Sequence, residues 1–172
     1  MAPALPPDGH VGAERFARAL ATLGESARAV IREAHDEAYS YASNFVGSAH
    51  LLLGLVADAS HRITAGLDER GVSPAVIRGC IEEITGVRQR PSPRFVHLPF
   101  SPQARALVVT AALLAEQAGA AATEPDHLWL AITRNHGLMA RQVLAELGQL
   151  DYVRELAGQS PPVPGASASP SA

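Results

Sequence analysis

Apolar residues recur every three or four positions along most of this chain, a spacing typical of amphipathic helices. The longest run keeps one apolar stripe for about five turns, and its opposite face carries polar side chains that we expect to be solvated. The stripe consists of Leu23, Ala27, Val30, Ile31, Ala34, Ala38 and Tyr41, and the polar face of Arg28, Arg32, Asp36 and Ser40. The pattern predicts a long helix over about 23–41.

Three shorter helices are predicted after it, each bounded by a capping signal. Ser48 is placed to cap a short apolar helix, and Gly71 is a natural stop for the next one. Ser73 followed by proline is a typical helix start, and Gly86 follows the end of that helix. The three predicted helices span 50–57, 60–70 and 74–85.

The second half of the chain repeats this order. Its long stripe consists of Ala104, Leu107, Val108, Ala111, Ala115 and Ala118. A capping-box pattern, Thr123-Glu124-Pro125-Asp126, starts a short helix that runs to about Arg134. A third helix follows from Gly137 and stops at Gly148, and a fourth lies around Tyr152 to Leu156.

Residues 77 positions apart match between the two halves. The matched pairs include Ala27 and Ala104, Arg28 and Arg105, Ala34 and Ala111, His50 and His127, Leu53 and Leu130, Leu67 and Leu144, Glu69 and Glu146, and Gly71 and Gly148. This is a duplicated four-helix unit, too long for a solenoid repeat. The chain is therefore predicted to be all-α, with two repeats related by a pseudo-two-fold axis and an extra N-terminal helix.

The remaining segments complete the predicted organisation. Residues 1–10 are rich in Pro and Gly and are expected to be flexible, and residues 159–172 read as a disordered tail. Repeats over 23–86 and 100–158 are joined by a Pro-containing linker at 87–99.

The extra helix is expected within residues 11–22, with Phe16, Leu20 and Leu23 on one face. In the second repeat, Val109 and Leu113 lie off the core stripe of the long helix. We expect the extra helix to cover them, and a partner or dimer interface is the alternative.

Composition excludes several function classes. The 172 residues carry a net charge of −3, which is a poor match for nucleic acid, and no apolar run is long enough for a membrane span. All fourteen cationic residues are Arg, so no Walker or Schiff-base lysine is available. The N-terminus has no signal-peptide pattern, and we expect a cytoplasmic protein without cofactors.

Polar residues that could carry chemistry have plainer interpretations. His50 and His127 suggest a metal or catalytic pair, but we expect each ring to pack in a first helical turn and donate a hydrogen bond to a neighbouring helix. The cluster at 33–37, which includes His35, is expected on a solvated helix face, and Cys80 in the core. We therefore predict no catalytic or metal site.

Three stretches resemble the double Clp N-terminal repeat: VGSAHLLLGLV at 46–56, LPFSPQARALV at 98–108 and TEPDHLWLAI at 123–132. The third helices also end in the family's manner, as LDERG and LAELG. The resemblance covers about 22–158. It implies the fold of the N-domain of ClpA/ClpC-type AAA+ unfoldases, here without ATPase modules, and we expect a complete, free-standing module.

The resemblance also implies candidate binding residues. In some relatives two glutamates help to bind phosphoarginine, and their positions fall on Ala49 and Asp126, so this recognition is expected to be degenerate here. Phe100 and Arg105 match residues that line a groove for adaptors and cyclic peptides in relatives. With Leu20 and Gln103 they form the predicted partner-binding set. A hydrophobic staple onto the next helix is the structural interpretation of Phe100.

We therefore expect a non-enzymatic protein- or peptide-binding module that acts as an adaptor or regulator of Clp-dependent proteolysis. The alternatives are a decoy that sequesters Clp-directed cyclic peptides, or an accessory subunit of the ClpP ring. Expected partners are Clp ATPase or protease subunits, client proteins or hydrophobic peptides, without nucleic acid or membrane.

Overall fold

The computed structural model describes residues 11–90, 92–94 and 97–159, and these residues form nine α-helices and no strand. The helices are α1 (Ala13–Ala21), α2 (Glu25–Ser40), α3 (Ser48–Val56), α4 (Arg62–Glu69), α5 (Pro74–Thr85), α6 (Pro102–Gln117), α7 (Pro125–Arg134), α8 (Met139–Glu146) and α9 (Leu150–Gly158). The all-α prediction is confirmed. The predicted flexible N-terminus and most of the predicted tail lie outside the described residues.

Two short backbone bridges join the halves and follow the pseudo-two-fold relation. Leu23 bridges Thr123, and Val46 bridges Phe100. Adding the offset of 77 to Leu23 and Val46 gives positions 100 and 123, so each bridge is the counterpart of the other. Their hydrogen bonds match: Gly24 N–H donates to Thr123 O and Ser101 N–H to Val46 O, both at 2.9 Å.

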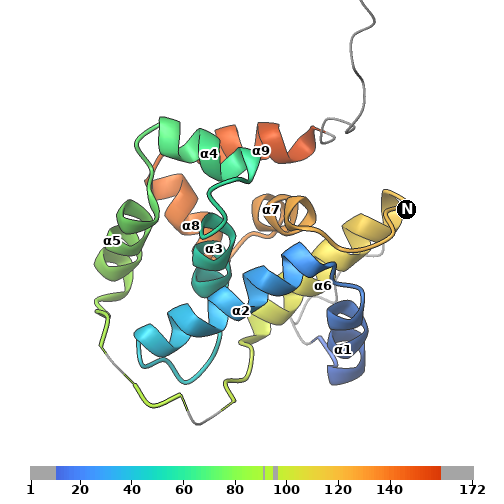
Figure 1. Cartoon of the computed structure of the whole chain (residues 1–172), viewed down its shortest axis with the longest axis horizontal. Coiled ribbons are helices and arrows are strands. Elements are labelled where there is room, and N and C mark those ends of the chain that lie inside the picture. Colours follow the sequence, from blue (N-terminus) through green and yellow to red (C-terminus); the bar gives the residue numbers. More distant parts are fainter. Residues whose placement is uncertain (1–10, 91, 95–96, 160–172) are drawn as a thin grey trace, which may run out of the picture.

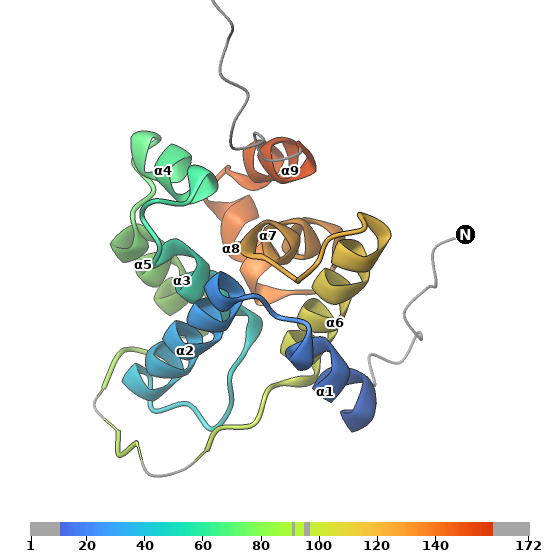
Figure 2. The same ribbon diagram turned by 45° about the vertical axis from the view of Figure 1, so that its right-hand side comes forward.

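Helix packing repeats the same symmetry (Figures 1 and 2). Helices α2 and α3 pack together in one half, as α6 and α7 do in the other. Contacts between the halves also come in equivalent pairs. Helix α2 contacts α7, and the matching contact is that of α3 with α6. In the same way, the contact of α5 with α8 matches that of α4 with α9. Each half thus completes its packing on the other, and one hydrophobic core runs through both.

Several predicted helix starts are wrong by one or two residues, including that of α8, which begins at Met139 and not at Gly137. Helix α3 is capped by Gly47, because Ser48 is already helical and its hydroxyl accepts a hydrogen bond from Ala140 N–H on α8 (3.2 Å). Helix α7 is capped by Glu124 rather than Thr123. Helix α4 begins after His61 and not at Ser60, whose hydroxyl and N–H both donate to Asp58.

Several other helix boundaries agree with the sequence pattern. Ser73 caps α5 by accepting a hydrogen bond from Val76 N–H, and Gly86 ends that helix with a φ of 69°. Gly71 and Gly148 follow α4 and α8 with φ values of 77° and 68°. These glycines occupy the left-handed region that other residues rarely adopt.

The extra helix is present and packs on α6 (Figure 2). Val109 on α6 is only 2% exposed, and Leu113 is packed against the core. The structure therefore favours coverage of this surface by α1 over the alternative of an open interface. None of the helices in the described part of the chain is long and apolar enough to cross a membrane.

Candidate functional site

A groove of about 940 Å³ opens at the N-terminal end of α3. Four segments line it: the α2–α3 connection, the C-terminal end of α5, the residues leading into α6, and the α7–α8 connection. Phe45 and Val87 are each 48% exposed and line the groove. Large apolar side chains are seldom left so exposed at a concave surface that binds nothing, so this groove is the leading candidate site.

The lining of the groove combines apolar side chains with neutral polar ones and, among the described residues, the cation Arg90. Met139, Ile81 and Phe100 contribute apolar surface, and no Asp or Glu belongs to the described lining. Tyr41 also lines the groove; burial and the neighbouring Glu82 raise its pKa to about 12, so the phenol stays neutral. Such a surface suits an apolar peptide segment held by a few hydrogen bonds.

His50, which also lines the groove, has a structural role. Its Nδ1 accepts a hydrogen bond from the N–H of the cap residue Gly47 (2.9 Å), and His127 does the same for Glu124 (2.9 Å). Both rings thus accept within their own first turn; the prediction that they donate to a neighbouring helix is wrong. Burial lowers the pKa of His50 to about 4 and also lowers that of His127.

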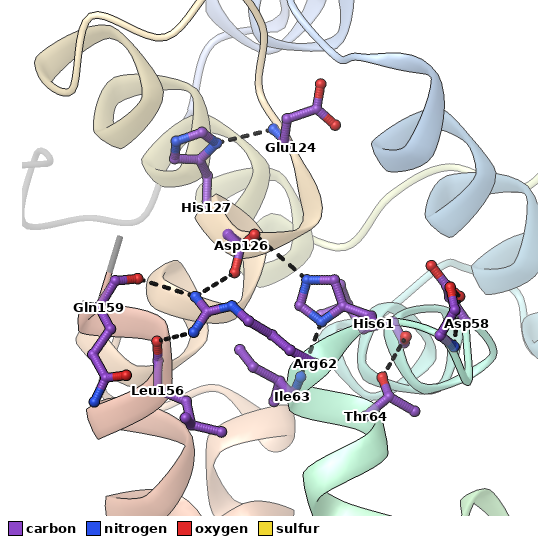
Figure 3. Close-up of polar contacts among 12 residues, drawn as sticks. Asp58, His61, Arg62, Ile63, Thr64, Glu124, Asp126, His127, Leu156 and Gln159 are labelled. Carbon is purple, nitrogen blue, oxygen red and sulfur yellow. Dashed lines mark hydrogen bonds and ion pairs between the residues drawn. The ribbon is translucent and has the colours of Figure 1, made fainter. Parts of the chain in front are cut away.

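The location related to the groove by the pseudo-two-fold axis is filled by an ion-pair cluster between the two halves (Figure 3). Asp126 accepts a hydrogen bond from the Arg62 guanidinium (2.7 Å) and faces Nε2 of His61 (3.5 Å). Arg62 also donates to the carbonyls of Leu156 (2.8 Å) and Gln159 (3.0 Å). Burial acts to raise the pKa of Asp126, but the hydrogen bonds and charges of His61 and Arg62 outweigh it and lower that pKa.

The two positions matched to phosphoarginine-binding glutamates therefore have different surroundings. Ala49 lines the open groove and offers no carboxylate. Asp126 has a carboxylate, but the chain's own Arg62 already occupies it. The structure does not bring these two residues together, since they belong to different ends of the pseudo-symmetric pair.

The predicted partner-binding residues divide between the groove and α1. Phe100 and Gln103 line the groove, and Gln103 is exposed. Phe100 is only 9% exposed, with the Phe16 ring at 5.1 Å and the His35 ring at 5.3 Å. Arg105 lies over the Phe16 ring at 5.7 Å, and Leu20 is partly buried on the core. Their role in partner binding stays a prediction.

The polar cluster at 33–37 is less solvated than expected. Glu33 and Asp36 are exposed, but Glu37 pairs with Arg78 of α5 and its side chain is only 14% exposed. His35 packs against the Phe100 and His97 rings. Helix α2 turns these two side chains toward neighbouring segments, so the expectation of a fully solvated face is wrong for them. Cys80 is buried, as expected, and burial raises the pKa of its thiol.

Within the described residues, no three His, Cys, Asp or Glu side chains are grouped as a bound metal ion would need.

Comparison with known proteins identifies the family. The profile of the Clp repeat (R) N-terminal domain matches residues 22–147. This chain belongs to the Clp repeat N-terminal domain family. Its fold also matches the N-terminal domain of the chaperone ClpD from Arabidopsis thaliana, with a TM-score of 0.67, 22% identity, and coverage of 80% of this chain and 96% of that one.

Full-length Clp proteins share this region. The chaperone ClpB of Oceanobacillus iheyensis is 27% identical over 124 residues, which are 72% of this chain and 15% of that protein. Chloroplastic ClpC1 of Arabidopsis thaliana is 31% identical over 124 residues, 72% of this chain and 13% of that protein. The chain thus corresponds to a small part of these curated relatives, and it is a Clp N-domain-like module.

Sequence reasoning missed the exposed large apolar residues in the groove of this Clp repeat module. Phe45 and Val87 lie outside the helical stripes, in segments read only as connections. The signal available was an aromatic residue between two helices, where a polar residue is more usual. Arg62 was missed as well, because its partners lie 64 and 94 positions away along the chain.

Proposed function

We propose that this chain is a non-enzymatic protein-binding module that regulates Clp-dependent proteolysis by holding an apolar peptide segment of a Clp subunit or client in its groove. The observation that carries this proposal is the groove of about 940 Å³ with Phe45 and Val87 exposed along it. Membership of the Clp repeat family supports the link to the Clp machinery.

The chemistry of the groove favours binding over catalysis. Cys80, the chain's single thiol, is not among the groove's lining residues; it is buried, and burial raises its pKa, which disfavours the thiolate. His50 uses Nδ1 as a hydrogen-bond acceptor in the α3 cap and is neutral at physiological pH. An apolar surface with satisfied polar neighbours recognises a ligand by burial and shape.

The test is a pair of matched surface variants. The double change Phe45→Ser with Val87→Ser removes the two exposed apolar side chains of the groove, whereas Val76→Ser removes the third exposed one, 40% exposed and outside the groove. A fluorescein-labelled decapeptide of Leu, Val, Phe and Ser is titrated against each full-length variant. We expect the double variant to bind at least about tenfold more weakly and Val76→Ser to bind like the wild type.

A second assay addresses the Clp machinery itself. A purified ClpC-type ATPase with ClpP degrades a fluorescent client while this chain is added at increasing concentration. An adaptor or regulator changes the rate, and the Phe45→Ser, Val87→Ser variant loses that effect. Peptide binding without any effect on degradation would instead support a decoy, and equal peptide binding by the double variant and Val76→Ser would refute the groove as the site.

A further inference from the structure

The groove has a positive charge at its edge. Among its described lining residues, Arg90 is the one side chain of the Asp, Glu, Lys and Arg class, and it is exposed. The histidine of the lining, His50, is neutral at physiological pH because burial lowers its pKa to about 4. The apolar surface of the groove therefore lies next to a single cation.

Arg90 also lines a second, smaller hollow of about 370 Å³, which adjoins the groove at this residue. The other described residues of this hollow all carry polar groups: Tyr39, Ser40, Gln89, Ser92 and Arg94. No Asp or Glu belongs to the described lining of either hollow. A peptide segment that leaves the groove past Arg90 thus passes from an apolar surface to a polar, cationic one.

Hydrogen bonds hold the backbone on both sides of Arg90. The Arg90 N–H donates to the carbonyl of Ser40 (2.8 Å), at the C-terminal end of α2. Gln89 donates from Nε2 to the Ser40 hydroxyl (3.3 Å). The Ser92 hydroxyl donates to the carbonyl of Tyr39 (2.7 Å). The chain after α5 is thereby held against the end of α2 (Figure 1), which positions Arg90 between the two hollows.

The other arginines of this stretch already have acidic partners. Arg88 pairs with Glu82 (3.2 Å), and Arg94 pairs with Asp36 (2.8 Å). Within the part of the chain that the structure describes, no hydrogen bond, ion pair or ring contact engages the Arg90 guanidinium. The charge that remains for a ligand at the junction of the two hollows is therefore that of Arg90.

We propose that the groove selects peptide segments in which an acidic residue follows or precedes the apolar stretch, and that Arg90 pairs with the carboxylate of that residue. This inference rests on the proposed function, because the groove with Phe45 and Val87 has to hold the apolar stretch. One unpaired guanidinium matches the single negative charge of a Glu or Asp side chain, and its N–H donors fit a carboxylate through two hydrogen bonds. Arg90 is thus a residue that determines specificity.

Three peptides that differ only in charge test the pairing. Each is the fluorescein-labelled decapeptide of Leu, Val, Phe and Ser, with an amidated C-terminus, extended at both ends by Glu, Gln or Lys so that the direction of binding does not matter. The full-length wild type should bind the Glu peptide about fivefold more tightly than the Gln peptide, and the Lys peptide most weakly, as one exposed ion pair allows. These differences should shrink as the salt concentration rises from about 0.05 M to about 0.5 M.

Variants of the exposed arginine assign the preference to one side chain. Arg90→Gln should bind the Glu and Gln peptides equally, and Arg90→Glu should prefer the Lys peptide. Arg154→Gln is the matched control, because it removes one positive charge from an exposed position on α9 that lines neither hollow, and it should keep the wild-type preference. Far-UV circular dichroism checks that the helices are retained in all three variants.

The outcomes separate this inference from the proposed function. Equal binding of the three peptides by the wild type, or an unchanged preference for Glu in Arg90→Glu, would overturn the role of Arg90 and leave the groove as the apolar binding site. Failure of the wild type to bind any of the peptides would refute the proposed function, and the role of Arg90 with it.

Discussion

The hydrogen bond of His50 makes the stability of the folded protein depend on pH. Its Nδ1 must carry a lone pair to accept the Gly47 N–H, and a protonated imidazole has none. Burial lowers the pKa of the ring to about 4, against 6.5 for an unperturbed histidine. The folded state therefore selects neutral His50, and His127 follows the same rule with a lowered pKa.

Acidification should consequently destabilise the protein in a defined window. Since the unfolded chain protonates His50 near pH 6.5 and the folded chain only near pH 4, stability is lost as the pH falls between these values. We expect His50 to account for a loss of about 2 kcal/mol between pH 7 and pH 5. Urea unfolding followed by the fluorescence of Trp129, the single tryptophan, measures it.

The matched variant is His50→Gln, which keeps an acceptor at the third helical position but does not titrate. Its unfolding free energy should fall less between pH 7 and pH 5 than that of the wild type. An identical pH dependence in both proteins would mean that His50 does not titrate differently on folding.

Contact between α2 and α3 depends on a glycine. A Cβ at Gly54 would lie 2.4 Å from the carbonyl oxygen of Val30, far closer than real Cβ contacts allow. The counterpart position in α7 holds Ala131, fully buried against the second half's pair of helices. The first pair thus approaches more closely than a methyl group permits, which makes Gly54 necessary despite the cost of glycine in a helix.

Alanine substitutions at two helical glycines should therefore change the unfolding free energy in opposite directions. Gly54→Ala should lower the unfolding free energy by about 1–3 kcal/mol, since the clash is with backbone that cannot move alone. Gly79→Ala, in α5 with open space around the position, should raise it by up to about 1 kcal/mol. Both are measured by urea unfolding at pH 7, and a stabilising Gly54→Ala would refute the tight approach.

The arrangement of the two halves is asymmetric at one pair of equivalent sites. At one site, Ala49 of the first half and Met139 of the second line the groove, whereas at the other their counterparts Asp126 and Arg62 form an ion pair. Arg62 on α4 reaches α7 through Asp126 and α9 through Leu156, so this cluster ties the halves together (Figure 3). The two equivalent sites thus differ in structure: one is an open groove, and the other is closed by an ion pair between the halves.

Substituting the residues of the groove site at their counterpart positions in the ion-pair site should reveal this division. Arg62→Met leaves the Asp126 carboxylate without its main partner and should cost about 1–3 kcal/mol of stability, because both side chains are about a quarter exposed. Adding Asp126→Ala should recover part of that loss. Urea unfolding of the wild type, both single variants and the double variant gives the coupling free energy, and strictly additive effects would contradict a linked pair.

The helical pattern, the duplication and most helix ends follow from local rules. Period-3.6 stripes, Ser73 with its proline, and the glycines after α4 and α8 each act within a few residues, so the sequence alone predicts them. The same holds for the extra helix, whose apolar face predicted a covering role. The predicted helix starts are wrong where a histidine ring, rather than a serine, satisfies the cap.

The site depends on contacts between distant segments, and only the tertiary structure decides it. The groove gathers four segments from about residue 41 to 142, so the exposure of Phe45 and Val87 appears only once they are assembled. The partners of Arg62 and the Phe16–Phe100 contact are likewise long-range. Local sequence determines which residues form helices; which side chains stay open or become paired is decided by packing between the two halves, since that packing sets their burial and their partners.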